Sequence, residues 1–126
     1  MNSEIALRMR LIGLELARHY YRFNAETALQ DGIATVLTNA DIAFEREYRA
    51  DKENRFDFRL DHGIVIEVKR AGSISEALHQ VDRYLRLDSV KGVLIATACS
   101  WGRSVRDIPD EYSKTLSIAY LRRSAL

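Results

Sequence analysis

The chain is poor in the residues that stabilise small disulfide-rich or zinc-binding domains. It has one cysteine, Cys99, and one proline, Pro109, among 126 residues. A single cysteine excludes an internal disulfide and a cysteine-rich zinc site, so we expect Cys99 to be a small core residue and the setting to be reducing and cytoplasmic. The sequence also shows no signal peptide, no apolar run long enough to span a membrane, no repeat and no low-complexity segment. These absences predict one ordinary globular domain with no membrane partner.

Charge of one sign is not in excess. Nineteen Lys and Arg residues balance eighteen Asp and Glu residues, which gives a net charge of +1. This balance excludes a broad basic field, so any contact with nucleic acid must come from local groups of arginines. The candidates near the start of the chain are Arg8, Arg10, Arg18 and Arg22, and those near its end are Arg103, Arg106, Arg122 and Arg123.

Residues 54 to 69, NRFDFRLDHGIVIEVK, have the pattern of two half-buried strands joined by a tight turn. Apolar side chains alternate with charged ones in both halves, which is the period of 2 expected of strands. Residues 61 to 63 form the predicted three-residue loop, in which Gly63 supplies the left-handed conformation. Such a loop pairs Leu60 with Ile64 and thereby sets the register of the whole hairpin.

This register places Asp57 opposite Glu67, with side-chain roots roughly 5 Å apart, and Lys69 one pleat further along the same face. Two carboxylates at this distance repel each other unless a cation lies between them. Magnesium or manganese would suit such a site, because hard cations take carboxylate oxygens and keep water in their remaining positions. Lys69 would then orient the attacking water or stabilise charge on a phosphate. The alternative is that these residues have no catalytic role, and that Glu and Lys simply alternate on a solvent-facing strand.

Residues 3 to about 22 are predicted to form a helix capped by Ser3. Apolar side chains cover so wide an arc of this helix that we expect burial on two sides, either within the domain or against another copy in a homodimer or higher homo-oligomer. One stripe consists of Ile5, Met9, Ile12 and Leu16, and the second consists of Leu7, Leu11 and Leu14.

A second helix is predicted to follow Asn24, its N-cap, and to run to about Leu37. Its inward stripe includes Leu29 and Ile33, and Glu26 lies on the same side at the first turn. Two explanations of Glu26 remain open. It either favours the positive end of the helix dipole and bends out to water, or it is a further ligand of the metal or of its water.

Residues 43 to 49 read as the strand that leads into the hairpin, with Glu45 and Glu47 as surface charges of which one could lie near the metal face. A helix capped by Ser73 or Ser75 follows the hairpin and runs to about residue 87. Its apolar stripe is predicted to consist of Ile74, Leu78, Val81 and Leu85, with Gln80 and Tyr84 in a second stripe beside it. The apolar run 91–98 predicts a strand buried on both faces, and a last strand is predicted at about 116–121.

The order of these elements and motifs resembles the PD-(D/E)XK nuclease superfamily over roughly residues 24 to 98. Asp57 resembles the family's metal-binding aspartate, Glu67-Val68-Lys69 its (D/E)-x-K element, and Glu26 the acidic residue of its first core helix. Gln80 and Tyr84 resemble the Gln-x3-Tyr element of the RecB-like branch. The family's proline before the aspartate is replaced by Phe56.

The resemblance implies an α/β fold, namely a restriction-endonuclease-like αβββαβ core with a mixed central sheet flanked by helices and an extra N-terminal helix. Residues 1–23 would be that helix, residues 24–98 the catalytic core, and residues 99–126 a C-terminal loop and strand. The implied activity is Mg²⁺- or Mn²⁺-dependent cleavage of DNA leaving a 5′-phosphate. Asp57, Glu67 and Glu26 would serve the metal, Lys69 the water, and Gln80 with Tyr84 the substrate strand. The alternative is a nucleic-acid-binding or assembly subunit that keeps the fold without cleaving.

Overall fold

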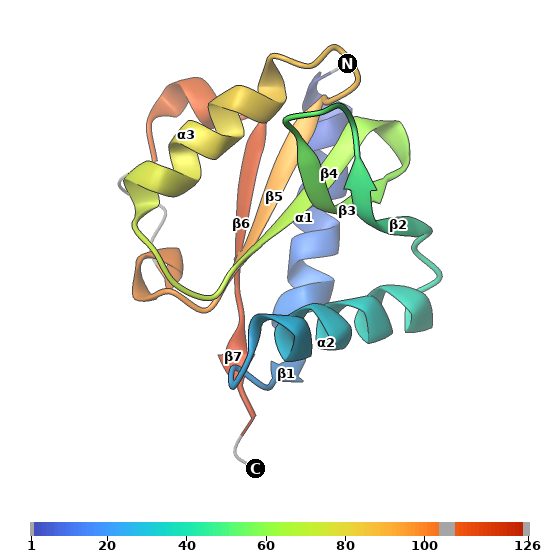
Figure 1. Ribbon diagram of the computed structural model, residues 1–126, viewed down its shortest axis with the longest axis vertical. Helices are drawn as coiled ribbons and strands as arrows, with labels where there is room; N and C mark the ends of the chain where they lie inside the picture. Colours follow the sequence, from blue (N-terminus) through green and yellow to red (C-terminus); the bar gives the residue numbers. More distant parts are fainter. Residues whose placement is uncertain (1, 104–107, 125–126) are drawn as a thin grey trace.

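The computed structural model describes residues 2–103 and 108–124, and within them three α-helices surround a mixed five-stranded sheet (Figure 1). The helices are α1 (Asn2–Ala17), α2 (Glu26–Asn39) and α3 (Ile74–Leu85). The sheet consists of β2 (Phe44–Arg49), β3 (Arg55–Leu60), β4 (Ile64–Lys69), β5 (Gly92–Thr97) and β6 (Leu116–Tyr120). Two short strands, β1 (Tyr20–Tyr21) and β7 (Arg122–Arg123), form a separate parallel pair. Short 3₁₀ turns are η1 (Asp61–Gly63), η2 (Ser100–Arg103) and η3 (Asp110–Tyr112).

The strand order in the sheet is β2-β3-β4-β5-β6. β3 runs antiparallel to both of its neighbours, and β4, β5 and β6 are parallel to one another. The predicted order of helix, three antiparallel strands, helix and strand is therefore confirmed, as is the mixed sheet with helices on its faces. β5 is buried along its whole length, as its apolar composition predicted.

Each face of the sheet has its own hydrophobic core. α1 and α2 pack on one face, where Leu16, Leu29 and Ile33 are fully buried against Ile66 and Leu94. α3 packs on the other face over Val65, Val93 and Ile95. Figure 1 shows α3 and α1 on opposite sides of the parallel strands. No helix among residues 2–103 and 108–124 is long and apolar enough to cross a membrane.

The predicted hairpin turn is present, with Phe58 paired to Ile66 and Arg59 to Val65. Gly63 has a φ of 75°, as predicted, and His62 beside it is also left-handed with a φ of 67°. A side chain at Gly63 would have its Cβ 2.8 Å from the carbonyl oxygen of Ser89, so glycine is required by space as well as by conformation.

The prediction of a first helix reaching residue 22 was wrong. α1 already includes Ser3, which is therefore not its cap, and it ends at Ala17. Tyr21 is 2% exposed, and its hydroxyl donates a 2.6 Å hydrogen bond to the carbonyl of Leu16 in the last turn. This bond satisfies one of the free carbonyls of the helix end, while Tyr20 and Tyr21 take extended backbone to pair with β7.

Two further local predictions were wrong. The N-cap of α2 is Ala25, one residue after Asn24, and it makes no side-chain capping bond. In α3 the residues that face the sheet are Ala77, Val81 and Tyr84, so the predicted apolar stripe lies partly at the edge of the interface. The capping of α3 was predicted correctly, because Ser73 and Glu76 form a reciprocal capping box.

Candidate functional site

The candidate site is built where β3 bends away from a regular ladder. The predicted alternation put Phe56 and Phe58 on one face, but Phe58 lies in the core under α2, whereas Phe56 packs edge-on against Tyr84 of α3 at 4.9 Å between ring centres. Asp57 lies between them. On the neighbouring strand β2, the facing position is Glu47, which has a left-handed φ of 56°. A non-glycine residue in this conformation is strained by about 1 kcal/mol or more, and such strain is common at functional sites.

Asp57 is held by two donors from different elements. The backbone N–H of Val68 donates a 2.8 Å bond to its Oδ2, so the side chain occupies the place where a backbone carbonyl would continue the β3–β4 ladder. Nε2 of Gln30 donates to its Oδ1 at 3.3 Å, and Gln30 in turn accepts a 3.4 Å bond from Arg46. Gln30 and Arg46 are not among the residues predicted for the site from the sequence. The available signal was the position of Gln30, one turn after Glu26 on the same face of the helix.

The side chain of Glu67 points toward α3, on the other face of the sheet from α2 and Gln30, and is 7% exposed. Nε2 of Gln80 donates a 2.9 Å bond to its Oε2, and the hydroxyl of Tyr84 lies 3.2 Å from its Oε1. The same hydroxyl lies 3.0 Å from the carbonyl oxygen of Arg55 and accepts a 2.9 Å bond from Gln80. Gln80 and Tyr84, predicted to contact a substrate strand, are thus brought directly onto the carboxyl group of Glu67.

Burial and mutual repulsion make both carboxyl groups weak acids. Burial raises the pKa of Glu67 to about 8, and repulsion from Asp57 adds to this shift, whereas the neighbouring Lys69 opposes it. The pKa of Asp57 is also raised, first by burial and then by repulsion from Glu26 and Glu47, against the hydrogen bond from Val68 and the charge of Lys69. Both carboxyl groups therefore hold a proton more tightly than exposed carboxyl groups do.

Lys69 is the last residue of β4, and its backbone is held by hydrogen bonds. Its carbonyl oxygen accepts from the N–H of Ala98 at 3.0 Å and from the hydroxyl of Thr97 at 2.9 Å. The thiol of Cys99, half-buried and not the core residue we predicted, lies 3.8 Å from the same oxygen. Thr97 itself is fully buried. The side chain of Lys69 is thus presented from a fixed point while remaining half-exposed.

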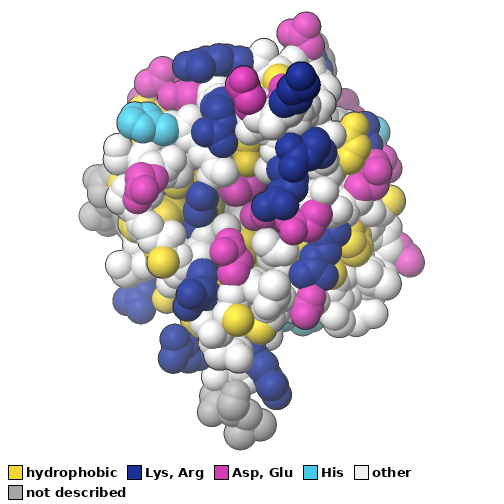
Figure 2. All heavy atoms as spheres, viewed as in Figure 1, with side chains coloured by type: hydrophobic (Ala, Val, Ile, Leu, Met, Phe, Trp, Pro, Cys, Tyr) yellow, Lys and Arg dark blue, Asp and Glu magenta, His cyan; other side chains and the backbone are white. Residues whose placement is uncertain are grey.

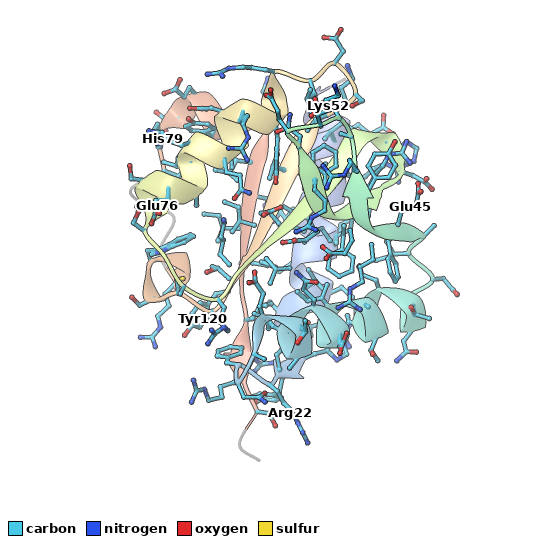
Figure 3. All side chains as sticks on the ribbon, in the orientation of Figure 1. Arg22, Glu45, Lys52, Glu76, His79 and Tyr120 are labelled. Atoms are coloured by element: carbon cyan, nitrogen blue, oxygen red, sulfur yellow. The ribbon has the colours of Figure 1, made fainter. Side chains whose placement is uncertain are left out.

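The remaining predicted carboxylates surround Asp57 without joining it in a ligand group. Glu26 is exposed at the first turn of α2, and together with Glu47 it acts on Asp57 through its charge. Glu45 points elsewhere and forms a 2.6 Å ion pair with Arg59 (Figure 3). Over the described part of the chain, no three His, Cys, Asp or Glu side chains come together as a metal-binding group. Asp57 and Glu67 are thus near enough for the charge of Asp57 to raise the pKa of Glu67, and Glu26 acts on Asp57 from an exposed position.

The pairing of β1 with β7 brings arginines from both ends of the chain to one end of the molecule. Arg122 stacks on Tyr20 at 4.3 Å from its ring centre, and Arg123 stacks on Phe23 at 5.3 Å. Figure 2 shows Lys and Arg side chains at the lower end of the molecule, and elsewhere on this face basic and acidic side chains are interspersed. We name these residues the arginine group: Arg18, Arg22, Arg103, Arg122 and Arg123. Arg106, predicted to belong to the same region, lies outside the described residues.

The arginine group lies beside the end of β4. Register places Lys69 next to Thr97 and Thr97 next to Tyr120, so Lys69 and Tyr120 are about 10 Å apart across the sheet. Arg103 stacks on Tyr120 and donates a 3.1 Å bond to its hydroxyl. Arg103 is thus the member of the arginine group that the register places near Lys69.

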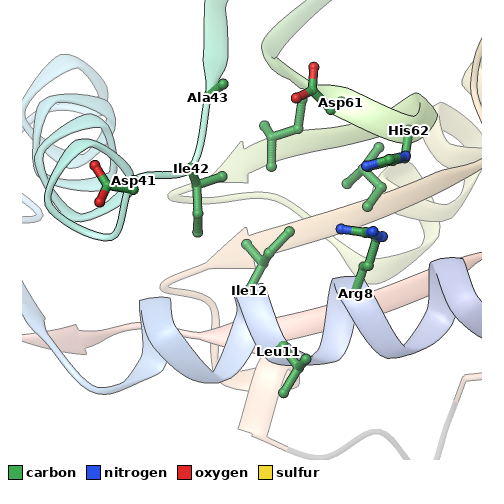
Figure 4. Close-up of a pocket in the computed structure, with 10 residues that line it drawn as sticks. Arg8, Leu11, Ile12, Asp41, Ile42, Ala43, Asp61 and His62 are labelled. Carbon is green, nitrogen blue, oxygen red and sulfur yellow. The ribbon is translucent and has the colours of Figure 1, made fainter.

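A hollow of about 270 Å³ lies at another part of the molecule, between α1, the end of α2 and the hairpin turn (Figure 4). It is lined by Arg8, Leu11, Asp41, Asp61 and His62, among others, and includes none of the candidate site residues. Comparison of the chain with protein-family models, with curated proteins and with solved structures found no match.

Proposed function

We propose that this protein is a metal-dependent DNA nuclease with a restriction-endonuclease-like core. The proposal rests chiefly on one observation: a partly buried and a buried carboxyl group on adjacent strands, both with raised pKa values, lie beside a lysine at the end of the second strand. The order α2-β2-β3-β4-α3-β5 supports it, because it is the αβββαβ order that the motif resemblance implied.

The donor set of the site fits a divalent cation. Each carboxylate has about four acceptor positions, and the protein occupies two on Asp57 and two on Glu67. Both groups therefore keep oxygen lone pairs for a ligand. Magnesium and manganese are bound by few carboxylates together with water, so two such groups suffice and Glu26 is free to bind through a water molecule. A bound cation of this kind would polarise a phosphoryl oxygen and lower the pKa of its water.

The residues around the carboxylates have distinct roles in this proposal. Lys69 places an ammonium group where negative charge develops on the phosphate and where the attacking water must be oriented. Gln80 and Tyr84 act as positioning residues, because their hydrogen bonds fix the orientation of the Glu67 carboxylate. Gln30 does the same for Asp57.

The arginine group supplies the expected contact with the DNA backbone. Guanidinium groups bind phosphates well because their donors are planar and permanently charged. The adjacent aromatic rings keep the guanidinium groups of Arg122 and Arg103 in place, so less side-chain entropy is lost on binding. A local group of this size suits a protein whose net charge is only +1.

The test is an assay of purified protein on linear, circular, single-stranded and branched DNA, each with magnesium, manganese or EDTA. Cleavage is expected with either metal and not with EDTA, and the products should carry 5′-phosphates. Asp57→Ala, Glu67→Ala and Lys69→Ala should each abolish cleavage with an unchanged circular dichroism spectrum.

Glu45→Ala is the control, because this residue lies on the same sheet but pairs with Arg59 outside the site. It should cleave as the wild type does. Wild-type rates in Lys69→Ala would refute the catalytic assignment. DNA binding without cleavage on every substrate and metal would replace the proposal with a binding subunit.

A further inference from the structure

The outer face of α1 carries an apolar stripe that the fold leaves uncovered. Among the described residues, four large hydrophobic side chains are exposed, and three of them lie on this helix: Leu7 at 57%, Leu11 at 57% and Leu14 at 55%. The fourth, Tyr20, is stacked under Arg122. Met9 and Leu16, which face the sheet, are 1% and 0% exposed.

The exposed stripe has the spacing of a coiled-coil seam. Leu7, Leu11 and Leu14 are separated by four and three residues, and the same alternation extends to Glu4 on one side and Arg18 on the other. Leu7 precedes the buried Met9 by two residues, about 200° around the helix. The seam of Glu4, Leu7, Leu11, Leu14 and Arg18 therefore points directly away from the core.

We infer that this seam pairs antiparallel with the same seam of a second copy, forming a homodimer with a two-fold axis at Leu11. In that arrangement Leu11 meets Leu11, Leu7 meets Leu14, and Glu4 meets Arg18 at both ends. A parallel pair would instead place Glu4 against Glu4 and Arg18 against Arg18. The charges at the two ends thus select the antiparallel orientation and a self-complementary partner.

Both end charges are available for such contacts. Glu4 pairs within its own helix with Arg8 at 3.8 Å, and Arg18 pairs with Glu15 at 3.2 Å. The side chains of Glu4 and Arg18 are 67% and 72% exposed, so these pairs are weak and can be exchanged for pairs across the dimer.

Hollows on the two sides of α1 leave room for a neighbouring helix. One, of about 270 Å³, is bordered by Arg8, Leu11 and Ile12 (Figure 4), and the other, of about 290 Å³, is bordered by Ala6, Leu7 and Arg10. Sixteen residues span about 24 Å, which gives a contact smaller than a standard interface, so we expect a dissociation constant on the order of micromolar. Glu67 faces α3 on the opposite side of the sheet, so the dimer does not cover this carboxylate, and of the arginine group it uses only Arg18.

The first test is the oligomeric state of the whole protein, measured by sedimentation equilibrium over a range of concentrations. Wild type should dissociate reversibly with dilution, and Leu11→Glu should weaken the dimer by about 100-fold because it buries two like charges at the axis. His79→Glu adds the same charge at an exposed position on α3 (Figure 3) and should dimerise as wild type does. Thermal melts would verify that each variant is folded.

Charge exchange and cysteine cross-linking test the orientation. Glu4→Arg and Arg18→Glu should each weaken the dimer about fivefold, whereas the double variant should recover wild-type affinity. In a Cys99→Ser background, Leu11→Cys should form a disulfide-linked dimer. Leu7→Cys should not, because antiparallel pairing separates its two copies by about 12 Å along the axis.

Three results would overturn the inference. The first is a protein that stays monomeric up to about 1 mM, where a dimer would contribute less than about 4 kcal/mol. The second is a dimer that survives Leu11→Glu. The third is cross-linking of Leu7→Cys as fast as that of Leu11→Cys, which would indicate parallel pairing.

Discussion

The hydroxyl of Tyr84 lies 3.2 Å from Oε1 of Glu67, close enough for a hydrogen bond between two buried groups. The same hydroxyl also lies 3.0 Å from the carbonyl oxygen of Arg55, yet it carries only one proton. When Glu67 is ionised, the two acceptors compete for that proton. The hydrogen bond from Tyr84 therefore lowers the pKa of Glu67 only weakly, because the carbonyl oxygen of Arg55 competes for its proton. Burial, which raises the pKa of Glu67, has the larger effect.

We predict that the metal-free protein loses stability as the pH rises from about 4.5 to 8. The pKa of Glu67 is raised from its ordinary value of 4.5 to about 8 in the folded protein, so the folded state holds a proton that the unfolded state has already released. The contribution is fully present below pH 4.5 and is lost as the pH rises through about 8. The free energy of unfolding should fall by up to about 1.4 kcal/mol per pH unit in this range. Urea unfolding in EDTA at several pH values would measure it.

Glu67→Gln is the control for this pH dependence, because its amide is neutral at every pH. The variant should show a much flatter profile between pH 4.5 and 8 and should be more stable than wild type at pH 8 without metal. The carboxylates with lowered pKa values, Glu15, Asp51 and Glu76, titrate below this range and do not contribute. Equal slopes in the two proteins would mean that Glu67 is already ionised in the folded state.

Tyr84→Phe should shift the pH dependence of activity upward. The hydrogen bond from Tyr84 lowers the pKa of Glu67, so its loss raises that pKa further. Metal binding requires the ionised carboxylate, and half-maximal metal binding and cleavage should therefore need a higher pH than in wild type. The lost bond should also cost about 1 kcal/mol of stability. Activity measured against pH at fixed magnesium, with chemical denaturation alongside, checks both effects.

Tyr112→Phe is a matched control for Tyr84→Phe. It also removes a hydroxyl that bonds to α3, in this case a 2.6 Å bond to Asp82, but it does not contact Glu67. Its stability should fall by a similar amount, while its pH profile of activity should stay at the wild-type position. A shift in both variants would show that the effect comes from loosening α3.

Glu26→Gln separates the two explanations of this residue. If Glu26 holds a metal-bound water, the variant should lose most of its turnover at low magnesium and recover part of it at high magnesium. If it serves only the helix dipole, the variant should lose a few tenths of a kcal/mol in stability and no activity. Because Glu26 raises the pKa of Asp57 through its charge, we expect the first result. Glu45→Gln is the control, because the carboxylate of Glu45 pairs with Arg59, and its turnover should depend on magnesium concentration as that of wild type does.

Adding metal should reverse which protein is more stable, wild type or Asp57→Asn. Without metal and above about pH 8, where Glu67 is ionised, the substitution removes one of two charges that repel each other, and its amide oxygen can still accept from Val68. Its melting temperature there should equal or exceed that of wild type. With manganese at a hundredfold excess over Kd, wild type should gain about 2.7 kcal/mol and the variant much less. Thermal melts in EDTA and in manganese would show this reversal.

Asp31→Asn is the control for the manganese response. Asp31 is an exposed partner of Arg46, so the variant loses a charge without losing a site oxygen. Its stabilisation by manganese should match that of wild type. The same metal response in Asp57→Asn as in wild type would remove Asp57 from the site.

The hairpin shows which parts of a fold a sequence can predict. Alternation and the loop ending in Gly63 were sufficient for the strands, the turn and the pairing of Phe58 with Ile66. Both signals are local, since a strand has a period of 2 and a short loop admits few registers. The prediction failed at Phe56, which packs against Tyr84 on the other face. The change of face coincides with a left-handed residue, Glu47, on the neighbouring strand between the partners of Phe58 and Phe56.

In the candidate site, too, some features could be predicted from local sequence and others could not. The proximity of Asp57, Glu67 and Lys69 followed from hairpin register, which the sequence specifies locally. The contacts of Gln80 and Tyr84 with Glu67 could not be predicted, because they depend on the rotation of α3 against the sheet. This rotation is set by how all the buried side chains pack. The apolar stripe of a helix sequence predicts which residues face the sheet only to within about one residue.

The sequence by itself determined the order of the elements, the tight hairpin and the closeness of Asp57, Glu67 and Lys69, because these depend on periodicity and on one glycine. The common charged face predicted for the three was wrong, since Glu67 is buried against α3. Only the tertiary structure decided that Tyr20 and Tyr21 leave the first helix to pair with Arg122 and Arg123. Residues about a hundred positions apart come together there, and no local pattern encodes a contact whose stability comes from burying Tyr21 against the rest of the fold.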